Sequence, residues 1–202
     1  MSTVARLSYV RRFLHFDHAT SCLDGKIWIF WLQGYSLSFE EFAEQVVHMS
    51  CTLLSGDVVT LSAIYANCTR VGRRPLWHAM EHISTNVSGP WLLAGDFNII
   101  SFADERSGGS HVNMGAMGDF NLAIFNCSLG DVEFDGPPFT WTYGRVWQRL
   151  DRALMNQQWS SVFGITKASH MPRGRSNRAP LLIKCGNQST FPTSFQFLNI
   201  WR

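Results

Sequence analysis

The sequence lacks a hydrophobic run long enough to cross a membrane. Its most apolar stretch, residues 27–39, is interrupted by Gln33 and Gly34, whereas a membrane helix needs about 20 consecutive apolar residues. We therefore expect no membrane partner. The first sixteen residues are basic and contain no acid, which superficially resembles a transit peptide. A strand or loop within a domain would have the same composition, and we favour that interpretation over a targeting segment or signal peptide.

Cysteine and net charge are both low. The five cysteines are odd in number and widely spaced, so they do not suggest a disulfide framework. We expect reduced core cysteines in an intracellular protein, nuclear or cytoplasmic. With 17 basic and 15 acidic residues the net charge is +2, which excludes the strong basic bias that would by itself indicate nucleic-acid binding. No repeat or linker divides the chain, and we expect one monomeric domain over residues 1–202.

Aromatic residues, in contrast, are abundant. They make up 13% of the chain, with 8 Trp and 15 Phe, which favours large packed sheets over a helical bundle. Apolar and β-branched runs predict strands at residues 26–32, 45–53, 58–66, 91–94, 131–134, 139–141, 146–150, 165–170 and 179–184. Helical spacing predicts helices at residues 75–87, 117–127 and 151–163. This irregular order favours layered sheets flanked by helices.

The most informative segment is WLLAGDFNII, residues 91–100. A buried apolar run ends there in Gly95, and Asp96 and Asn98 follow one residue apart, on the same side of an extended chain. A carboxylate and an amide at one strand end can hold a water, a metal ion or a phosphate. An Asx-turn that closes the strand is the alternative.

A second motif is short but matches a known pattern. His78, Glu81 and His82 fit H-x-x-E-H, the inverted zinc-peptidase motif, with both histidines one helical turn apart. No third ligand is evident, and the apolar face of the predicted helix leaves these positions on its solvated side. A zinc peptidase is therefore the less favoured alternative function.

Five segments, taken in order, carry a family resemblance. They are IYAN (64–67), WLLAGDFN (91–98), GPPFTWTYGR (136–145), RLDRAL (149–154) and SNRAPLLI (176–183). Together they resemble the endonuclease/exonuclease/phosphatase superfamily, also called DNase I-like. More narrowly, the chain resembles the endonuclease domain of plant LINE-type non-LTR retrotransposons, from about Gly25 to Arg202.

The resemblance implies an α/β (α+β) fold: a two-layer β-sandwich flanked by helices, with the active site at the strand ends. It implies hydrolysis of phosphodiester bonds in DNA with Mg²⁺ or Mn²⁺, with Asp96 as water activator and weak metal ligand. Asn98 would position phosphate or water, Tyr65 would contact the phosphate, and Asp151 would orient a catalytic histidine. The tail FQFLNIWR, residues 195–202, resembles the stretch that leads towards a reverse transcriptase, which this sequence does not contain.

The chain departs from the family pattern at its closing motif. Where the family has Ser-Asp-His, this sequence has Ser176-Asn177-Arg178, so both catalytic side chains are replaced. Arg178 stays protonated and cannot cycle a proton as histidine does. The chain is also expected to begin after the family's first strands, which carry an Asn and a metal-binding Glu. These losses predict an impaired or inactive copy, truncated at its N-terminus.

Arginines are frequent in the last third of the chain. We expect Arg149 and Arg175 to contact substrate, as part of a rim around the cleft that faces DNA, although a solvated charged face is the commoner explanation. The rim residues are Arg145, Arg149, Arg152, Arg173, Arg175 and Arg178. If catalysis is lost and the rim persists, the alternative function is a non-catalytic nucleic-acid-binding remnant. Trp141 is expected to pack in the core rather than stack on a base.

Overall fold

A six-stranded sheet forms the centre of the protein. The computed structural model describes residues 3–22, 25–109 and 111–186. The sheet has the order β3-β4-β5-β6-β12-β8, and β5 and β6 are its parallel pair while the other neighbours are antiparallel. Its strands are β3 (Ser36–Phe42), β4 (Val46–Thr52), β5 (Val58–Tyr65), β6 (Trp91–Asp96), β12 (Asp151–Met155) and β8 (Gly130–Asp131).

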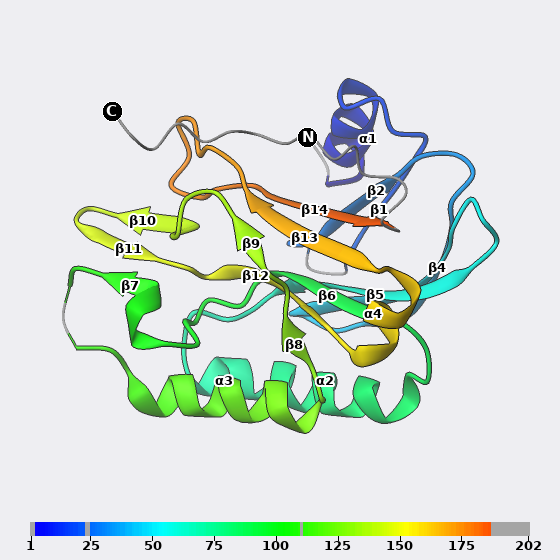
Figure 1. Ribbon diagram of the computed structural model, residues 1–202. Helices are drawn as coiled ribbons and strands as arrows, with labels where there is room; N and C mark the ends of the chain where they lie inside the picture. Colours follow the sequence, from blue (N-terminus) through cyan, green and yellow to red (C-terminus); the bar gives the residue numbers. More distant parts are fainter. Residues whose placement is uncertain (1–2, 23–24, 110, 187–202) are drawn as a thin grey trace, which may run out of the picture.

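Two helices, α2 (Arg74–Asn86) and α3 (Met114–Asn126), cover one face of this sheet (Figure 1). A short 3₁₀ turn, η1 (Val71–Arg73), leads into α2, and Pro75 occupies its first turn, where a missing amide costs nothing. Leu76, Met80 and Ile83 recur at helical spacing and are buried against the sheet together with Phe120 of α3. This cluster forms the larger of the hydrophobic cores and fixes the sheet edge that ends in Asp96.

Smaller sheets lie on the opposite face and at the end of the large sheet. β9 (Phe134–Asp135), β13 (Ile165–His170) and β14 (Leu181–Gly186) form one, and β1 (His18–Ser21) pairs with β2 (Trp28–Trp31) beside α1 (Thr3–Phe13) (Figure 1). β7 (Arg106–Ser107), β10 (Trp141–Tyr143) and β11 (Val146–Gln148) form a third, next to the 3₁₀ turn η2 (Ala103–Glu105). The last helix, α4 (Gln157–Val162), follows β12.

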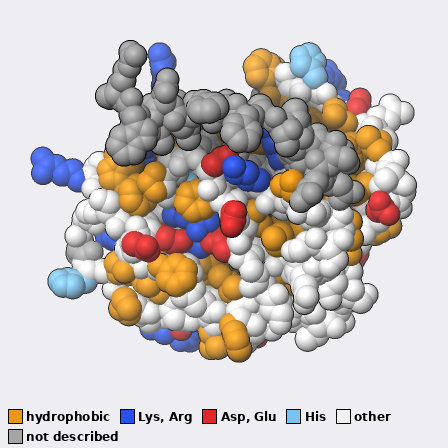
Figure 2. Space-filling view, viewed as in Figure 1, with side chains coloured by type: hydrophobic (Ala, Val, Ile, Leu, Met, Phe, Trp, Pro, Cys, Tyr) orange, Lys and Arg blue, Asp and Glu red, His pale blue; other side chains and the backbone are white. Residues whose placement is uncertain are grey.

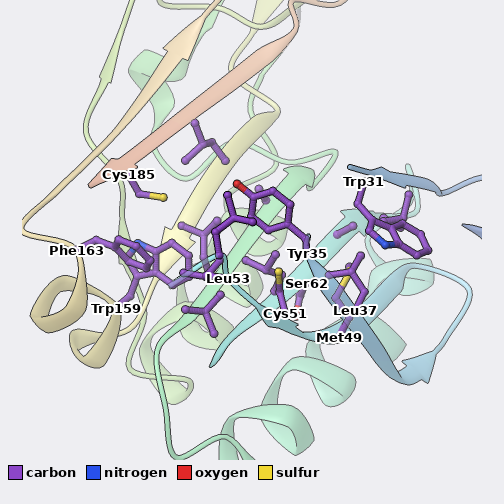
Figure 3. A pocket seen from close by; sticks show the side chains of 18 of the residues that line it. Trp31, Tyr35, Leu37, Met49, Cys51, Leu53, Ser62, Trp159, Phe163 and Cys185 are labelled. Carbon is purple, nitrogen blue, oxygen red and sulfur yellow. The ribbon is translucent and has the colours of Figure 1, made fainter. Parts of the chain in front are cut away.

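An apolar cavity of about 940 Å³ lies against the face of the large sheet that α2 and α3 do not cover. Figure 3 shows its wall, where Leu37, Met49 and Cys51 come from β3 and β4 and Trp159 comes from α4. Trp31 of β2 and Cys185 of β14 also line it. The cavity contains none of the predicted site residues.

The predicted fold class, mixed α/β with sheets flanked by helices, is confirmed. Within the described residues no helix is long and apolar enough to span a membrane. The prediction of core cysteines is correct for three and wrong for two, because Cys68 and Cys185 are exposed. The tail at residues 195–202 lies outside the described part of the chain.

Two predictions of secondary structure were wrong. Residues 151–163 are not one helix: β12 forms first and pairs with β6 and β8, and Asn156 then caps the short helix α4. Burial on both sides of a central strand removes the alternation that marks an exposed one. The N-terminal residues predicted as strand or loop form the helix α1.

Candidate active site

Three predicted site residues lie side by side at one edge of the large sheet. Tyr65 is the register partner of Asp96 across the parallel β5-β6 pair, and Asp96 is the partner of Asp151 across the antiparallel β6-β12 pair. Tyr65 is partly exposed, whereas the Asp96 and Asp151 side chains are only 6% and 14% exposed. The sheet therefore brings a phenol and two carboxylates to one place.

Gly95 allows this edge to form. Its φ is +141°, and a Cβ built there would lie 2.1 Å from the backbone oxygen of Ile64. Any side chain would both clash with the neighbouring strand and strain the backbone. Glycine is thus the residue that lets β6 approach β5 closely just before Asp96.

Asn98 closes the strand through a turn. Its φ of 50° is left-handed, a region that asparagine tolerates, and its backbone N–H donates to Asp96 Oδ1 at 2.9 Å. Its side-chain amide donates to the Ala66 carbonyl at 2.7 Å. The Asx-turn considered above is therefore present, and it leaves Asp96 Oδ2 and Asn98 Oδ1 facing the same guanidinium group, that of Arg178.

Arg178 extends its side chain over Asp96 and Asp151. The backbone around it pairs with the β10 strand: the Thr142 amide donates to the Asn177 carbonyl at 2.9 Å, and the Ala179 amide donates to the Thr140 carbonyl at 2.7 Å. From this position Arg178 Nη2 lies 2.5 Å from Asp96 Oδ2 and 3.4 Å from Asn98 Oδ1. Its Nη1 lies 3.4 Å from both oxygens of Asp151. One guanidinium group thus contacts three predicted site residues.

Burial is the main reason why the pKa values of Asp96 and Asp151 are both raised. Burial raises the pKa of Asp96, although the positive charge of Arg178 and the amide of Asn98 act against it. Burial and the nearby charge of Asp96 raise the pKa of Asp151 to about 6, against the opposing effects of Thr140 and Arg178. Arg178 is closer to Asp96 than to Asp151, which is consistent with the larger share of its charge reaching Asp96.

The residues present do not fit a divalent metal ion. Both oxygens of Asp96, the predicted ligand, already have neighbours: the Asn98 amide on Oδ1 and the Arg178 guanidinium on Oδ2. In the part of the chain that the structure describes, no three His, Cys, Asp or Glu side chains converge as a metal-binding group. A site for Mg²⁺ needs several oxygen ligands at close to 2.1 Å, free of a competing cation.

Arg149 does not lie where the sequence suggested. It is buried, and Nη1 is 2.7 Å from Asp131 and 2.9 Å from Glu105. Arg152 binds the same two carboxylates at 2.8 and 2.7 Å. Burial opposes the ionisation of Glu105, but Arg152 and Arg149 outweigh it and lower its pKa. The structure therefore places Arg149 inside the protein, with its charge paired to two carboxylates rather than exposed at a rim, and its contact with substrate stays an untested prediction.

Sequence reasoning missed Arg73. It is almost fully buried, and its Nη1 donates to the carbonyl oxygens of Asn67, Cys68 and Asn98, each at 3.0 Å. Arg73 therefore joins the segments that follow β5 and β6 and holds Asn98 in place. No local pattern signals this role, since an arginine before a helix ordinarily lies in solvent.

The β10-β11 hairpin, which pairs with the backbone at Arg178, carries aromatic side chains and lies beside basic ones. Trp141 packs partly against the larger core, as expected, and its ring stacks with that of the exposed Tyr143. The Arg173 guanidinium lies 4.3 Å from the centre of the Trp147 ring. Arg175 is exposed on the same segment as Arg178. Acidic and basic side chains are intermingled on the face shown in Figure 2, rather than segregated into a basic stripe.

Two other predicted positions lie on the surface. Asn177, at the degenerate motif, is exposed and contributes its backbone carbonyl to the pairing with Thr142. The His78 side chain on α2 is 80% exposed, and its Nδ1 lies 3.8 Å from Glu81 Oε2. Glu81 in turn accepts a hydrogen bond from Asn126 at 2.8 Å. The motif His78, Glu81 and His82 therefore lies on the solvated surface of α2 and takes no part in the contacts of Arg178 with Asp96 and Asp151.

Comparisons with known proteins identify the fold. No family model matches the chain, and no curated protein matches it by sequence. Among solved structures, it is similar to the endonuclease domain of TRAS1, a telomere-specific non-LTR retrotransposon, with a TM-score of 0.62 and 12% identity over 85% of this chain and 79% of that one.

A second similar structure is the 3′-5′ exonuclease NExo from Neisseria meningitidis, with a TM-score of 0.56 and 14% identity over 92% of this chain and 96% of that one. A third is an endonuclease/exonuclease/phosphatase family protein from Leptotrichia buccalis, with a TM-score of 0.56 and 14% identity over 89% and 75%. At these identities the likeness concerns the fold. The protein has the fold of the endonuclease/exonuclease/phosphatase structures, a fold whose solved representatives here are nucleases and phosphatases.

Proposed function

We propose that this chain is the endonuclease domain of a LINE-type retroelement of the plant type, directed at DNA phosphodiesters and impaired in catalysis. The observation that carries the proposal is the alignment of Tyr65, Asp96 and Asp151 at one sheet edge, with Asn98 beside them. The fold of the chain and the order of its motifs support the same conclusion. One similar structure, a 3′ phosphatase from Neisseria, is described with a product DNA hairpin, at a TM-score of 0.54 and 14% identity over 76% of this chain and 70% of that one.

In this proposal each residue acts through the protons or hydrogen bonds that its side chain can donate or accept. Asp96 accepts a proton from the attacking water, Asn98 orients that water or a phosphate oxygen, and Tyr65 donates to the phosphate from the partly exposed edge of β5. Asp151, which in this role would orient a histidine, instead faces the guanidinium of Arg178. Since Arg178 cannot exchange a proton near neutral pH, loss of this general acid or base predicts a rate lower by about 10²–10⁴.

Nicking of supercoiled DNA in the presence of Mg²⁺ tests the proposal. We expect little or no nicking by the wild-type chain and a measurable gain in the double variant Asn177→Asp, Arg178→His, which restores the family residues. The gain should vanish when Asp96→Ala is added. Arg12→Ala is the control, since it removes an exposed arginine that is not part of the rim. Robust wild-type nicking that depends on Asp96 would contradict the impairment, and a double variant without any gain would contradict the assigned roles.

The second candidate is a non-catalytic DNA-binding remnant, which the β10-β11 hairpin favours. The exposed Tyr143 and the Arg173–Trp147 pair offer stacking surface beside exposed arginines. If this surface binds DNA, affinity should fall steeply with salt, because bound phosphates release counterions. The paired change Arg145→Ala, Arg175→Ala should weaken binding and flatten the salt dependence. Binding that ignores salt, or that is unchanged in this variant, would argue against the remnant.

A further inference from the structure

Two buried carboxylates face each other across the end of the sheet and require a counter-charge. Asp96 and Asp151 are direct register partners on β6 and β12, and both side chains are largely removed from water. Two negative charges on paired positions of neighbouring strands repel strongly where the surroundings are less polar than water. Among the described residues, Arg178 is the basic side chain within ion-pair distance of both. The other nearby arginine, Arg73, points its donors at backbone carbonyls.

We propose that Arg178 is a built-in cation that replaces a divalent metal ion as the counter-charge of Asp96 and Asp151, so that the wild-type chain excludes Mg²⁺ and Mn²⁺ from this centre. The inference deepens the proposed function and rests on it only for the expectation of a metal. It concerns metal binding without DNA. Its outcome is therefore independent of whether the chain cleaves anything.

The geometry explains why metal and guanidinium exclude each other. A divalent ion on Asp96 Oδ2 would need that oxygen at about 2.1 Å, while Arg178 Nη2 already lies 2.5 Å from it. Oδ1 is engaged by the Asn98 amide. Because a guanidinium group does not lose its proton in proteins, raising the pH does not release the site. Backbone pairing of residues 177–179 with residues 140–142 keeps Arg178 over the carboxylates.

Binding of Mn²⁺ to the purified chain without DNA tests the proposal, followed by electron paramagnetic resonance or calorimetry near neutral pH. We expect the wild type to bind Mn²⁺ at this centre at best weakly, and Arg178→Gln to bind it at least about tenfold more tightly. Arg178→Lys keeps the positive charge and should resemble the wild type. Arg12→Ala, which removes an exposed positive charge outside both the carboxylate pair and the rim, should also resemble the wild type.

The double variant Asp96→Asn, Arg178→Gln locates the new site, and the gain should be lost in it. Equal Mn²⁺ affinity in wild type and Arg178→Gln, or a gain that survives Asp96→Asn, would overturn the proposal. If Arg178→Gln does not fold without metal, its refolding yield is measured with added Mn²⁺. Recovery that requires Asp96 supports the exchange of one cation for the other, and absence of recovery refutes it.

Discussion

Replacing Asp151 by Asn should change how stability depends on pH. In the folded chain, burial and the charge of Asp96 raise the pKa of Asp151 from 3.8 to about 6. Between these values the folded chain binds more protons than the unfolded chain, so the free energy of unfolding falls as the pH rises. The contribution of Asp151 is fully present below about pH 4 and is lost above about pH 6.

The size of the effect follows from the shift. A difference of about two pKa units corresponds to about 3 kcal/mol at 1.36 kcal/mol per unit, and little discount for solvent screening applies because the side chain is 14% exposed. Asparagine has nearly the same shape and does not titrate. Relative to wild type, Asp151→Asn should therefore become more stable by about 3 kcal/mol as the pH rises from 4 to 7.

Urea denaturation of both chains across this pH range measures the difference directly. Taking the difference cancels titrating groups that do not interact with Asp151, such as Glu105, whose lowered pKa acts in the opposite direction. Asp96 does not cancel in this way, because its charge acts on Asp151 and the titration of each carboxyl depends on the other. Asp104→Asn, which removes an exposed carboxyl group that is not part of the Asp96–Asp151 pair, serves as the control. A difference that is constant with pH, or that favours wild type as the pH rises, would refute the reasoning.

Three further changes test the supports of the site by chemical denaturation. Arg152→Met should cost about 3–5 kcal/mol, because it leaves Glu105 and Asp131 short of a buried partner, while Lys167→Ala, in an exposed pair, should cost less than about 1 kcal/mol; equal costs would contradict the distinction. Gly95→Ala should leave little folded protein by circular dichroism, given the 2.1 Å approach to a backbone oxygen, and a native-like spectrum would show that the strands can separate. Asn156→Ala should cost about 1–2 kcal/mol, because Asn156 Oδ1 accepts from the first turn of α4 and from the Trp91 amide; an unchanged midpoint would exclude a capping role.

Much of the sheet edge was readable from the sequence because its determinants are local. The run before Gly95 is apolar since β6 is buried on both faces, and Asp96 and Asn98 come together through a local Asx-turn, which these residue types favour. The helix at α2 was likewise predicted by Pro75 and the spacing of its apolar residues. Such patterns lie within a few residues and need no knowledge of the rest of the chain.

What the sequence could not supply depends on contacts distant along the chain. Arg178 and Asn98 are 80 positions apart, and Arg152 and Glu105 are 47 apart. Arg149 was expected in a rim that faces DNA because arginines are frequent in the last third of the chain, and the contacts of Arg149 with Glu105 and Asp131, which are distant in sequence, place it inside the protein instead. The pairing of β12 with β6 and β8 turned a predicted helix into a strand, and with it moved Asp151 from a helix to the register position beside Asp96.

Under the proposed function, arginine in place of histidine at position 178 would lower catalysis while it stabilises the two carboxylates beside it. A histidine at this position would gain and lose a proton as the pH changes, so its positive charge on Asp96 and Asp151 would not be permanent. The chain would then depend on a bound cation to hold two buried carboxylates side by side. Arginine removes that dependence because its charge is permanent and its planar group reaches both carboxylates at once. Arg178→His would therefore restore a proton-transfer group and, with it, the need for a bound metal ion. A variant that lacks either the proton-transfer group or the metal ion should stay inactive.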